Sequence, residues 1–129
     1  MTTISYSVIL TEIIFLVSDK NKEHHVTQFH YIGWPDHGAP DSTAPIISLV
    51  RDVRAKLVST KNKNINILVH CSAGVGRTGT FIALYQLMDL LDVLSKENSG
   101  LSNTIDIFNT VLQLRSKRIM MVSTSVTII

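Results

Sequence analysis

The chain has 129 residues, of which 45% are hydrophobic, with a formal net charge of +2 and one cysteine. This length and apolar content predict one domain, residues 1–129, with a core of its own. The basic residues are scattered, which argues against nucleic-acid binding, and a single cysteine excludes an internal disulfide and fits a reducing compartment.

The N-terminal third has the pattern of a β-hairpin. Residues 6–17 are rich in β-branched and apolar side chains, residues 18–21 have turn composition, and residues 26–32 alternate apolar and polar side chains. Residues 4–16 are too short and too interrupted to span a bilayer, so no membrane segment is expected. The three histidines of the hairpin lack the spacing of zinc ligands, so no metal site is predicted.

Residues 33–40, GWPDHGAP, break all periodicity and predict a loop made rigid by its prolines. Residues 42–57 then predict a helix with Asp41 or Ser42 as its N-cap. Its apolar residues recur at helical spacing and define one inward face, comprising Ile46, Leu49, Val50, Val53 and Leu57.

The cysteine lies in the segment VHCSAGVGRTGT, residues 69–80. An apolar run before it, 65–69, predicts a buried strand, and a longer run after it, 81–94, predicts a helix buried on most sides. A glycine-rich turn at a helix N-terminus offers N–H groups and a positive dipole to an anion. The same field favours a thiolate, so the pKa of Cys71 is expected below about 8.5, and Arg77 can fold back to hold phosphate oxygens.

A last helix is predicted from Ser102 or Asn103, either of which can cap it, to about residue 116. Arg115 and Arg118 form a small basic face at its end, for which solvated charge is the expected state. Its inward residues are expected to be Ile105, Phe108, Val111 and Leu112.

The segment VHCSAGVGRTGTF resembles the signature loop of the protein tyrosine phosphatases, His-Cys-x-Ala-Gly-x-Gly-Arg-Ser/Thr-Gly, at every fixed position. The upstream segment QFHYIGWPDHGAP resembles the movable acid loop of the tyrosine-specific, receptor-like branch. The resemblance covers about Ser7 to Thr124 and corresponds to the C-terminal half of the family's catalytic domain. It implies an α/β fold, with a central mixed sheet flanked by helices around a strand–phosphate loop–helix core. The chain is about half as long as such domains, so a truncated domain with exposed apolar surface is expected.

The resemblance implies hydrolysis of phosphotyrosine in a protein substrate through a phosphocysteine, without metal, cofactor or nucleic acid. It implies a cytoplasmic location, or the cytoplasmic portion of a receptor. Cys71 would be the nucleophile, Asp36 the general acid, Arg77 the oxyanion clamp and Trp34 the anchor of the acid loop. His70 would hold the loop and lower the thiol pKa, and Thr78 would donate to the sulfur. The amides expected to bind phosphate are those of Ser72, Ala73, Gly74, Val75, Gly76 and Arg77.

Three alternatives stay open at this point. Members of the family carry a Gln-Thr-x-x-Gln segment that includes a glutamine positioning water, and here only Thr124 is kept, with Thr127 in place of the second glutamine. A weak or inactive phosphotyrosine binder is therefore one alternative, and a dual-specificity phosphatase is another. The third is dinucleotide binding, because residues 74–79 satisfy G-x-G-x-x-G, with Asp92 near the required acidic position.

Overall fold

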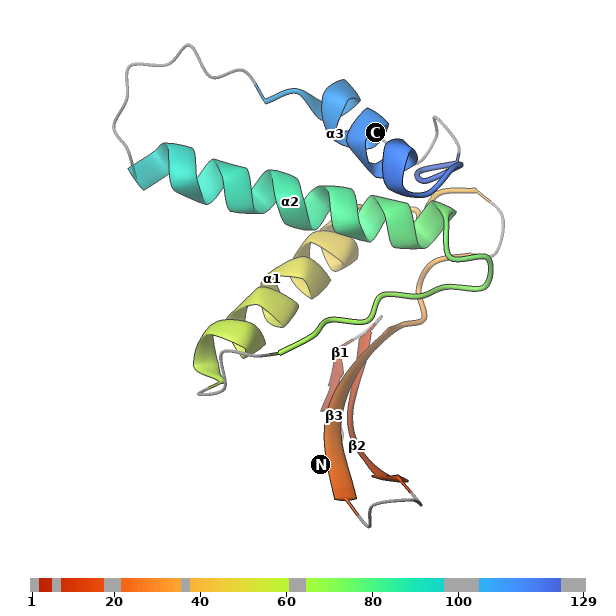
Figure 1. Ribbon diagram of the computed structural model, residues 1–129, viewed down its shortest axis with the longest axis vertical. Coiled ribbons are helices and arrows are strands. Elements are labelled where there is room, and N and C mark those ends of the chain that lie inside the picture. The colour runs from red at the N-terminus through yellow and green to blue at the C-terminus, as the bar shows by residue number, and fades with distance from the viewer. Residues whose placement is uncertain are drawn as a thin grey trace. The chain divides into compact units, whose positions relative to one another are not determined.

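The computed structural model describes residues 3–5, 8–17, 22–35, 38–60, 65–96 and 105–123. The chain forms two compact units, Met1–Lys61 and Asn62–Ile129, each of which is described by itself. Three strands precede three helices, in the order β1, β2, β3, α1, α2 and α3 (Figure 1). This combination of sheet and helices confirms the predicted α/β class.

The first unit contains an antiparallel sheet of β1 (Thr3–Ser5), β2 (Val8–Val17) and β3 (Lys22–Tyr31), in that order. The register of β2 and β3 is continuous from the Val8–Tyr31 pair to the Val17–Lys22 pair. The predicted hairpin is confirmed, with a second strand that begins at Lys22 instead of Val26; its predicted turn, 18–21, lies outside the described residues.

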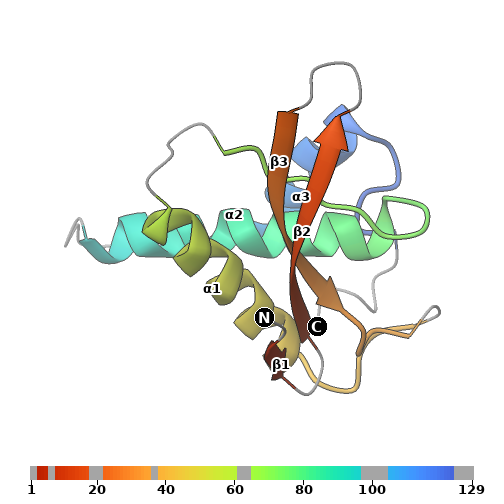
Figure 2. The same cartoon turned by 90° about the horizontal axis from the view of Figure 1, so that it is seen from below.

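Helix α1 (Ala44–Ser59) follows the sheet and contacts β3 (Figure 2). Thr43 occupies the N-cap position, not Asp41 or Ser42, although the Ser42 hydroxyl accepts a hydrogen bond from the N–H of Ala44 at 3.3 Å. The predicted inward face is confirmed at four positions, while Leu57 is only half-buried. Each buried aliphatic side chain contributes about 1.5–3 kcal/mol. The four buried residues are Ile46, Leu49, Val50 and Val53.

The segment 65–70 corrects the prediction of a buried strand. It has no regular secondary structure, and Leu68 is 87% exposed. The described strands form one antiparallel sheet, whereas the family resemblance implied a mixed sheet. A strand needs a neighbour to pair its N–H and C=O groups, and the second unit has no described strand. The apolar composition of the run is typical of a strand, but composition does not show whether a neighbouring strand is there to pair with it.

The second unit is built on α2 (Gly76–Lys96), which begins inside the cysteine motif and not at Phe81. Its first turns are buried, whereas Leu90, Leu91 and Val93 near its end are 40–47% exposed. The prediction of a helix buried on most sides therefore holds only for its N-terminal part. None of the helices in the described ranges is both long and apolar enough to cross a membrane.

Helix α3 (Ile107–Lys117) packs along α2 (Figure 1). Its N-cap is Asp106, whose Oδ1 accepts from the N–H of Asn109 at 2.8 Å. The predicted caps, Ser102 and Asn103, both lie outside the described residues. A buried cluster joins the two helices to the segment after α3. Its members are Ala83, Val111, Leu114, Met121 and Val122, with Ile82 packed against them.

Two residues that were predicted to face inward on α3 do not. Phe108 is 74% exposed and Leu112 is 46% exposed, while Val111 is buried as predicted. Ile119 and Met120 after the helix are also largely exposed. The expected exposed apolar surface is therefore present on this unit.

Candidate active site

The cysteine loop turns directly into α2. Residues 72–75 bend without regular structure, and the helix begins at Gly76. Gly74 has a left-handed backbone, with φ of 69°, which glycine adopts without the steric cost that a side chain would add. The positive end of the helix dipole and its unpaired N–H groups therefore adjoin the loop that carries Cys71.

The sulfur of Cys71 is held by donors from this loop and the first helical turn. The hydroxyl of Thr78 donates to Sγ at 3.1 Å, and the N–H of Gly74 donates to it at 3.2 Å. Partial burial raises the pKa of this thiol, but hydrogen bonds from the Thr78 side chain and from the backbone of Thr78, Gly74 and Val75 outweigh burial. The pKa of Cys71 therefore lies below its ordinary value.

Arg77 reaches back across the loop, as the spacing of six residues after the cysteine allows. Its Nη2 lies 3.4 Å from the hydroxyl of Ser72, and the side chain is half-buried. A guanidinium in this place presents a planar donor fork at the rim of the turn. The loop thus combines a nucleophile of lowered pKa, amide donors and a fixed cation, which is the equipment for binding an oxyanion beside a thiolate.

The remaining candidate residues are His70, Trp34 and Asp36. His70 precedes Cys71 and is exposed. Trp34 belongs to the first unit, where it is buried, donates from Nε1 to the carbonyl of Gly38 at 3.1 Å and packs edge-to-face with Tyr31. This contact closes the Trp-Pro-Asp loop on itself. Asp36 lies outside the described residues, so its role stays a prediction.

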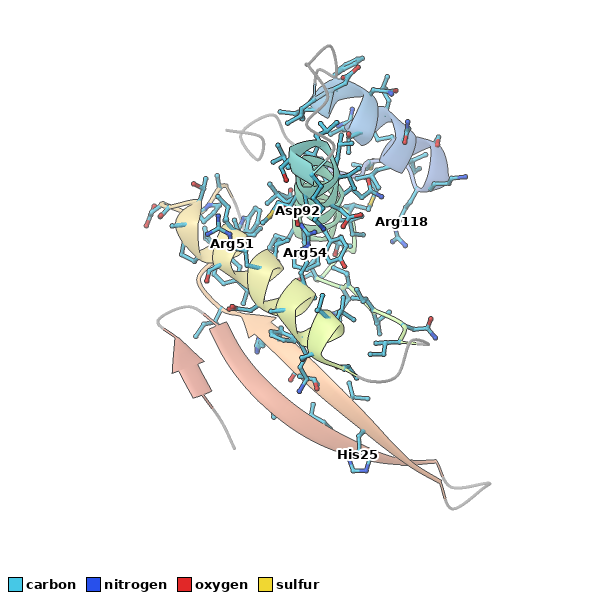
Figure 3. All side chains as sticks on the ribbon, turned by 90° about the vertical axis from the view of Figure 1, so that its left-hand side faces the viewer. His25, Arg51, Arg54, Asp92 and Arg118 are labelled. Carbon is cyan, nitrogen blue, oxygen red and sulfur yellow. The ribbon has the colours of Figure 1, made fainter. Side chains whose placement is uncertain are left out.

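Two arginines that were predicted to be solvated are exposed, as expected, but they also form hydrogen bonds. Arg118 donates from Nη2 to the carbonyl of Ala73 at 3.1 Å (Figure 3). Arg115 donates to the carbonyls of Met121 and Val122 at 2.9 and 2.8 Å. The helical spacing of the two arginines placed them on one face, but spacing does not reveal which backbone that face meets.

Ser123 is a further residue that sequence reasoning missed. Its Oγ lies so close to Gly76 that a Cβ on this glycine would approach it to 2.8 Å. The side chain of Ser123 therefore borders the start of α2, where the phosphate loop ends. Thr127, which takes the place of a glutamine in the family pattern, lies outside the described residues.

The dinucleotide alternative does not fit this geometry. The acidic residue of that motif stands at the end of a second strand, about 20 residues beyond the glycines. Asp92 instead lies inside α2, and the next described element after α2 is the helix α3. We therefore reject dinucleotide binding.

Comparison with known proteins identifies the family. The sequence model described as "Protein-tyrosine phosphatase" matches residues 3–128. The chain belongs to the protein-tyrosine phosphatase family. The match includes the cysteine loop and α2.

Among the curated relatives are receptor-type enzymes. The chain is 41% identical over 107 residues to receptor-type tyrosine-protein phosphatase eta of Gallus gallus, and 44% identical to that of Mus musculus. It is 38% identical over 118 residues to tyrosine-protein phosphatase corkscrew of Drosophila virilis. These matches cover 83%, 81% and 89% of this chain but only 7%, 8% and 15% of the relatives. The chain therefore spans a small part of the proteins that it resembles.

Proposed function

We propose that this chain hydrolyses phosphotyrosine in protein substrates. The observation that carries the proposal is the state of Cys71, whose sulfur accepts hydrogen bonds from Thr78 and Gly74 at the N-terminus of α2 and whose pKa is lowered. A nucleophilic thiolate inside a nest of amide donors suits attack on a phosphate monoester. Membership of the family supports this reading of the site.

In the first proposed step, the Cys71 thiolate attacks phosphorus. A sulfur–phosphorus bond forms while the bond from phosphorus to the tyrosine oxygen breaks. The departing phenolate has a conjugate acid of pKa about 10, so it leaves poorly unless it is protonated. Asp36 supplies that proton, and Arg77 with the amides of 72–77 stabilises the charge on the equatorial oxygens.

In the second proposed step, water hydrolyses the phosphocysteine. Asp36, now a carboxylate, accepts a proton from water as the oxygen bonds to phosphorus and the sulfur leaves as a thiolate. The hydroxyl of Thr78, at 3.1 Å from the sulfur, stabilises this leaving group. Inorganic phosphate is released, and the enzyme returns to its starting state. We also propose a cytoplasmic location; the need of a thiolate nucleophile to stay reduced supports it.

The test is an assay of the purified chain on an aryl phosphate, with Cys71→Ser as the control. The expected result is release of phosphate that Cys71→Ser abolishes. Rapid acid quenching should trap one phosphoryl group on the chain, detectable by mass. Since the sequence has one cysteine, a thiol-linked phosphate can only be on Cys71.

A non-catalytic phosphotyrosine binder is the second candidate. It is favoured by the exposed segment before the loop, where Leu68 is 87% exposed, and by the replacement of the family glutamine by Thr127. Retained binding of a phosphotyrosine peptide without any turnover would establish this candidate in place of the enzyme. Equal turnover of phosphoserine and phosphotyrosine peptides would instead establish dual specificity.

A further inference from the structure

Two peptide units of the phosphate loop are held from outside the loop by residues at and beyond the end of α3. The carbonyl of Ala73 accepts a hydrogen bond from Arg118 Nη2 at 3.1 Å. The carbonyl of Val75 accepts one from the N–H of Val122 at 3.1 Å. The carbonyl of Ala73 shares its peptide unit with the N–H of Gly74, and the carbonyl of Val75 shares its unit with the N–H of Gly76.

The geometry of a trans peptide makes these contacts informative. Within one planar unit, the C=O and the N–H of the next residue point in opposite directions. Fixing the carbonyl of Ala73 on one side therefore fixes the N–H of Gly74 on the other, where it donates to Cys71 Sγ at 3.2 Å. Gly74 has the left-handed backbone that glycine tolerates, so this unit would otherwise rotate easily.

Arg118 is itself held in place. Its backbone N–H donates to the carbonyl of Leu114 at 3.0 Å and closes the last turn of α3. Its guanidinium lies close to the loop, where a Cβ built on Gly74 would sit 3.4 Å from Nη2. The positive charge therefore stands directly behind the peptide that it bonds.

The segment after α3 shares this support. Met120 and Val122 have left-handed backbones, with φ of 64° and 54°. This conformation is costly above all for Val122, because its side chain is β-branched. Arg115 binds the carbonyls of Met121 and Val122, which holds the N–H of Val122 toward the loop. Strain maintained next to a candidate site is typical of functional geometry.

We infer that Arg118 is a positioning residue for the proposed reaction. Its guanidinium holds the Ala73–Gly74 peptide in the orientation that directs the Gly74 N–H at the sulfur and at a bound oxyanion. The inference rests on the proposed function for its catalytic meaning. One consequence does not depend on catalysis. Removal of the Arg118 donor lets the Ala73–Gly74 peptide rotate, which weakens both oxyanion binding and stabilisation of the thiolate.

The experiment uses Arg118→Met in the full chain, with inorganic tungstate as the oxyanion probe. Affinity is measured by calorimetry, and the thiol pKa by the ultraviolet absorption of the thiolate, which reports Cys71 alone. We expect tungstate to bind about tenfold more weakly, the loss typical of one hydrogen bond from a charged donor, and the pKa of Cys71 to rise. Arg118→Lys, which keeps a cation and a donor, should restore part of both.

Lys117→Met is the matched control, because it removes the same charge from an exposed neighbour. We expect it to leave both measurements unchanged. Unchanged values in a folded Arg118→Met variant overturn the inference, and so does an equal change in Lys117→Met, which would reduce the effect to net charge. Arg118→Leu, which also lacks a donor, replaces Arg118→Met if the latter does not fold, with the same two criteria.

Turnover of an aryl phosphate is measured on the same proteins. If the unmodified chain has no turnover but Arg118→Met weakens tungstate binding, the proposed function fails and the positioning of the loop stands. If turnover is present and Arg118→Met matches the unmodified chain in affinity, pKa and rate, the inference fails by itself.

Discussion

The cysteine loop and the Trp-Pro-Asp loop are held in different ways. The cysteine loop is bonded to residues distant in sequence, such as the Ala73–Arg118 contact across 45 positions. The described contacts of the Trp-Pro-Asp loop are local: Trp34 bonds the carbonyl of Gly38 four positions away and packs against Tyr31. The cysteine loop is thus held by residues distant in sequence, while these two contacts of Trp34 are to residues three and four positions away.

This difference matches what the two loops are proposed to do. Charge stabilisation in phosphoryl transfer depends on donors that are already oriented, because reorientation during the reaction is costly. A general acid can instead arrive with a loop that closes over the substrate. The comparison can be tested from both sides.

The largest expected effect concerns the acid loop. Asp36→Ala should slow phosphotyrosine hydrolysis by about 10²- to 10⁴-fold, the usual contribution of a general acid. An ester with a good leaving group, such as dinitrophenyl phosphate, should lose far less, because its leaving group needs no proton. Steady-state rates on both substrates give the ratio. Equal losses would remove Asp36 from the acid role.

The next effect concerns the close approach behind the cysteine loop. A Cβ on Gly79 would lie 2.4 Å from the backbone N of Val122, so Gly79→Ala must push α2 and this segment apart. We expect the free energy of unfolding to fall by about 1–3 kcal/mol, the cost of overpacking, together with loss of activity. Urea denaturation measures it, with exposed Gln86→Ala in the same helix as control. A stability equal to that of the control would show that the approach is not tight.

A smaller effect concerns the pH dependence of the nucleophile. The pKa of Cys71 is lowered in the folded chain, so the thiolate stabilises the fold above the unfolded pKa, and this contribution is lost as the pH falls through the folded pKa. Thr78→Val removes one of the donors and should move the acidic limb of kcat/KM to higher pH. Thr78→Ser keeps the hydroxyl and should not. An unshifted limb in Thr78→Val would contradict the assignment of this donor.

The smallest effect concerns the strained segment after α3. Met120 is 63% exposed and has a φ of 64°, a backbone region that favours glycine. Met120→Gly relieves the strain of the left-handed backbone but adds conformational entropy to the unfolded chain. The net effect should be a rise of about 1 kcal/mol in the free energy of unfolding. Ile119→Gly, at a neighbouring exposed position without left-handed backbone, should lower it. Thermal and urea denaturation measure both; a destabilised Met120→Gly variant would refute the strain.

The sequence by itself determined the elements whose signals are local. Alternation predicted the β2–β3 hairpin, helical spacing predicted the buried face of α1, and the glycine-rich segment around Cys71 predicted an anion-binding turn. These patterns depend on neighbours a few residues away, which the sequence displays directly. The contact of Thr78 with the sulfur was implied by the family resemblance, and the structure contains it.

Only the tertiary structure decided what each element meets. The run 65–69 has the composition of a strand but no described partner, and Phe108 fits the inward pattern of α3 yet is exposed. Arg118 looked like a solvated charge, but its guanidinium bonds Ala73 because α3 ends beside the cysteine loop. Such contacts join residues far apart in sequence, and periodicity carries no information about them. The chemistry of Cys71 was therefore readable from its motif, while the support of its loop depends on how α3 and the segment after it pack.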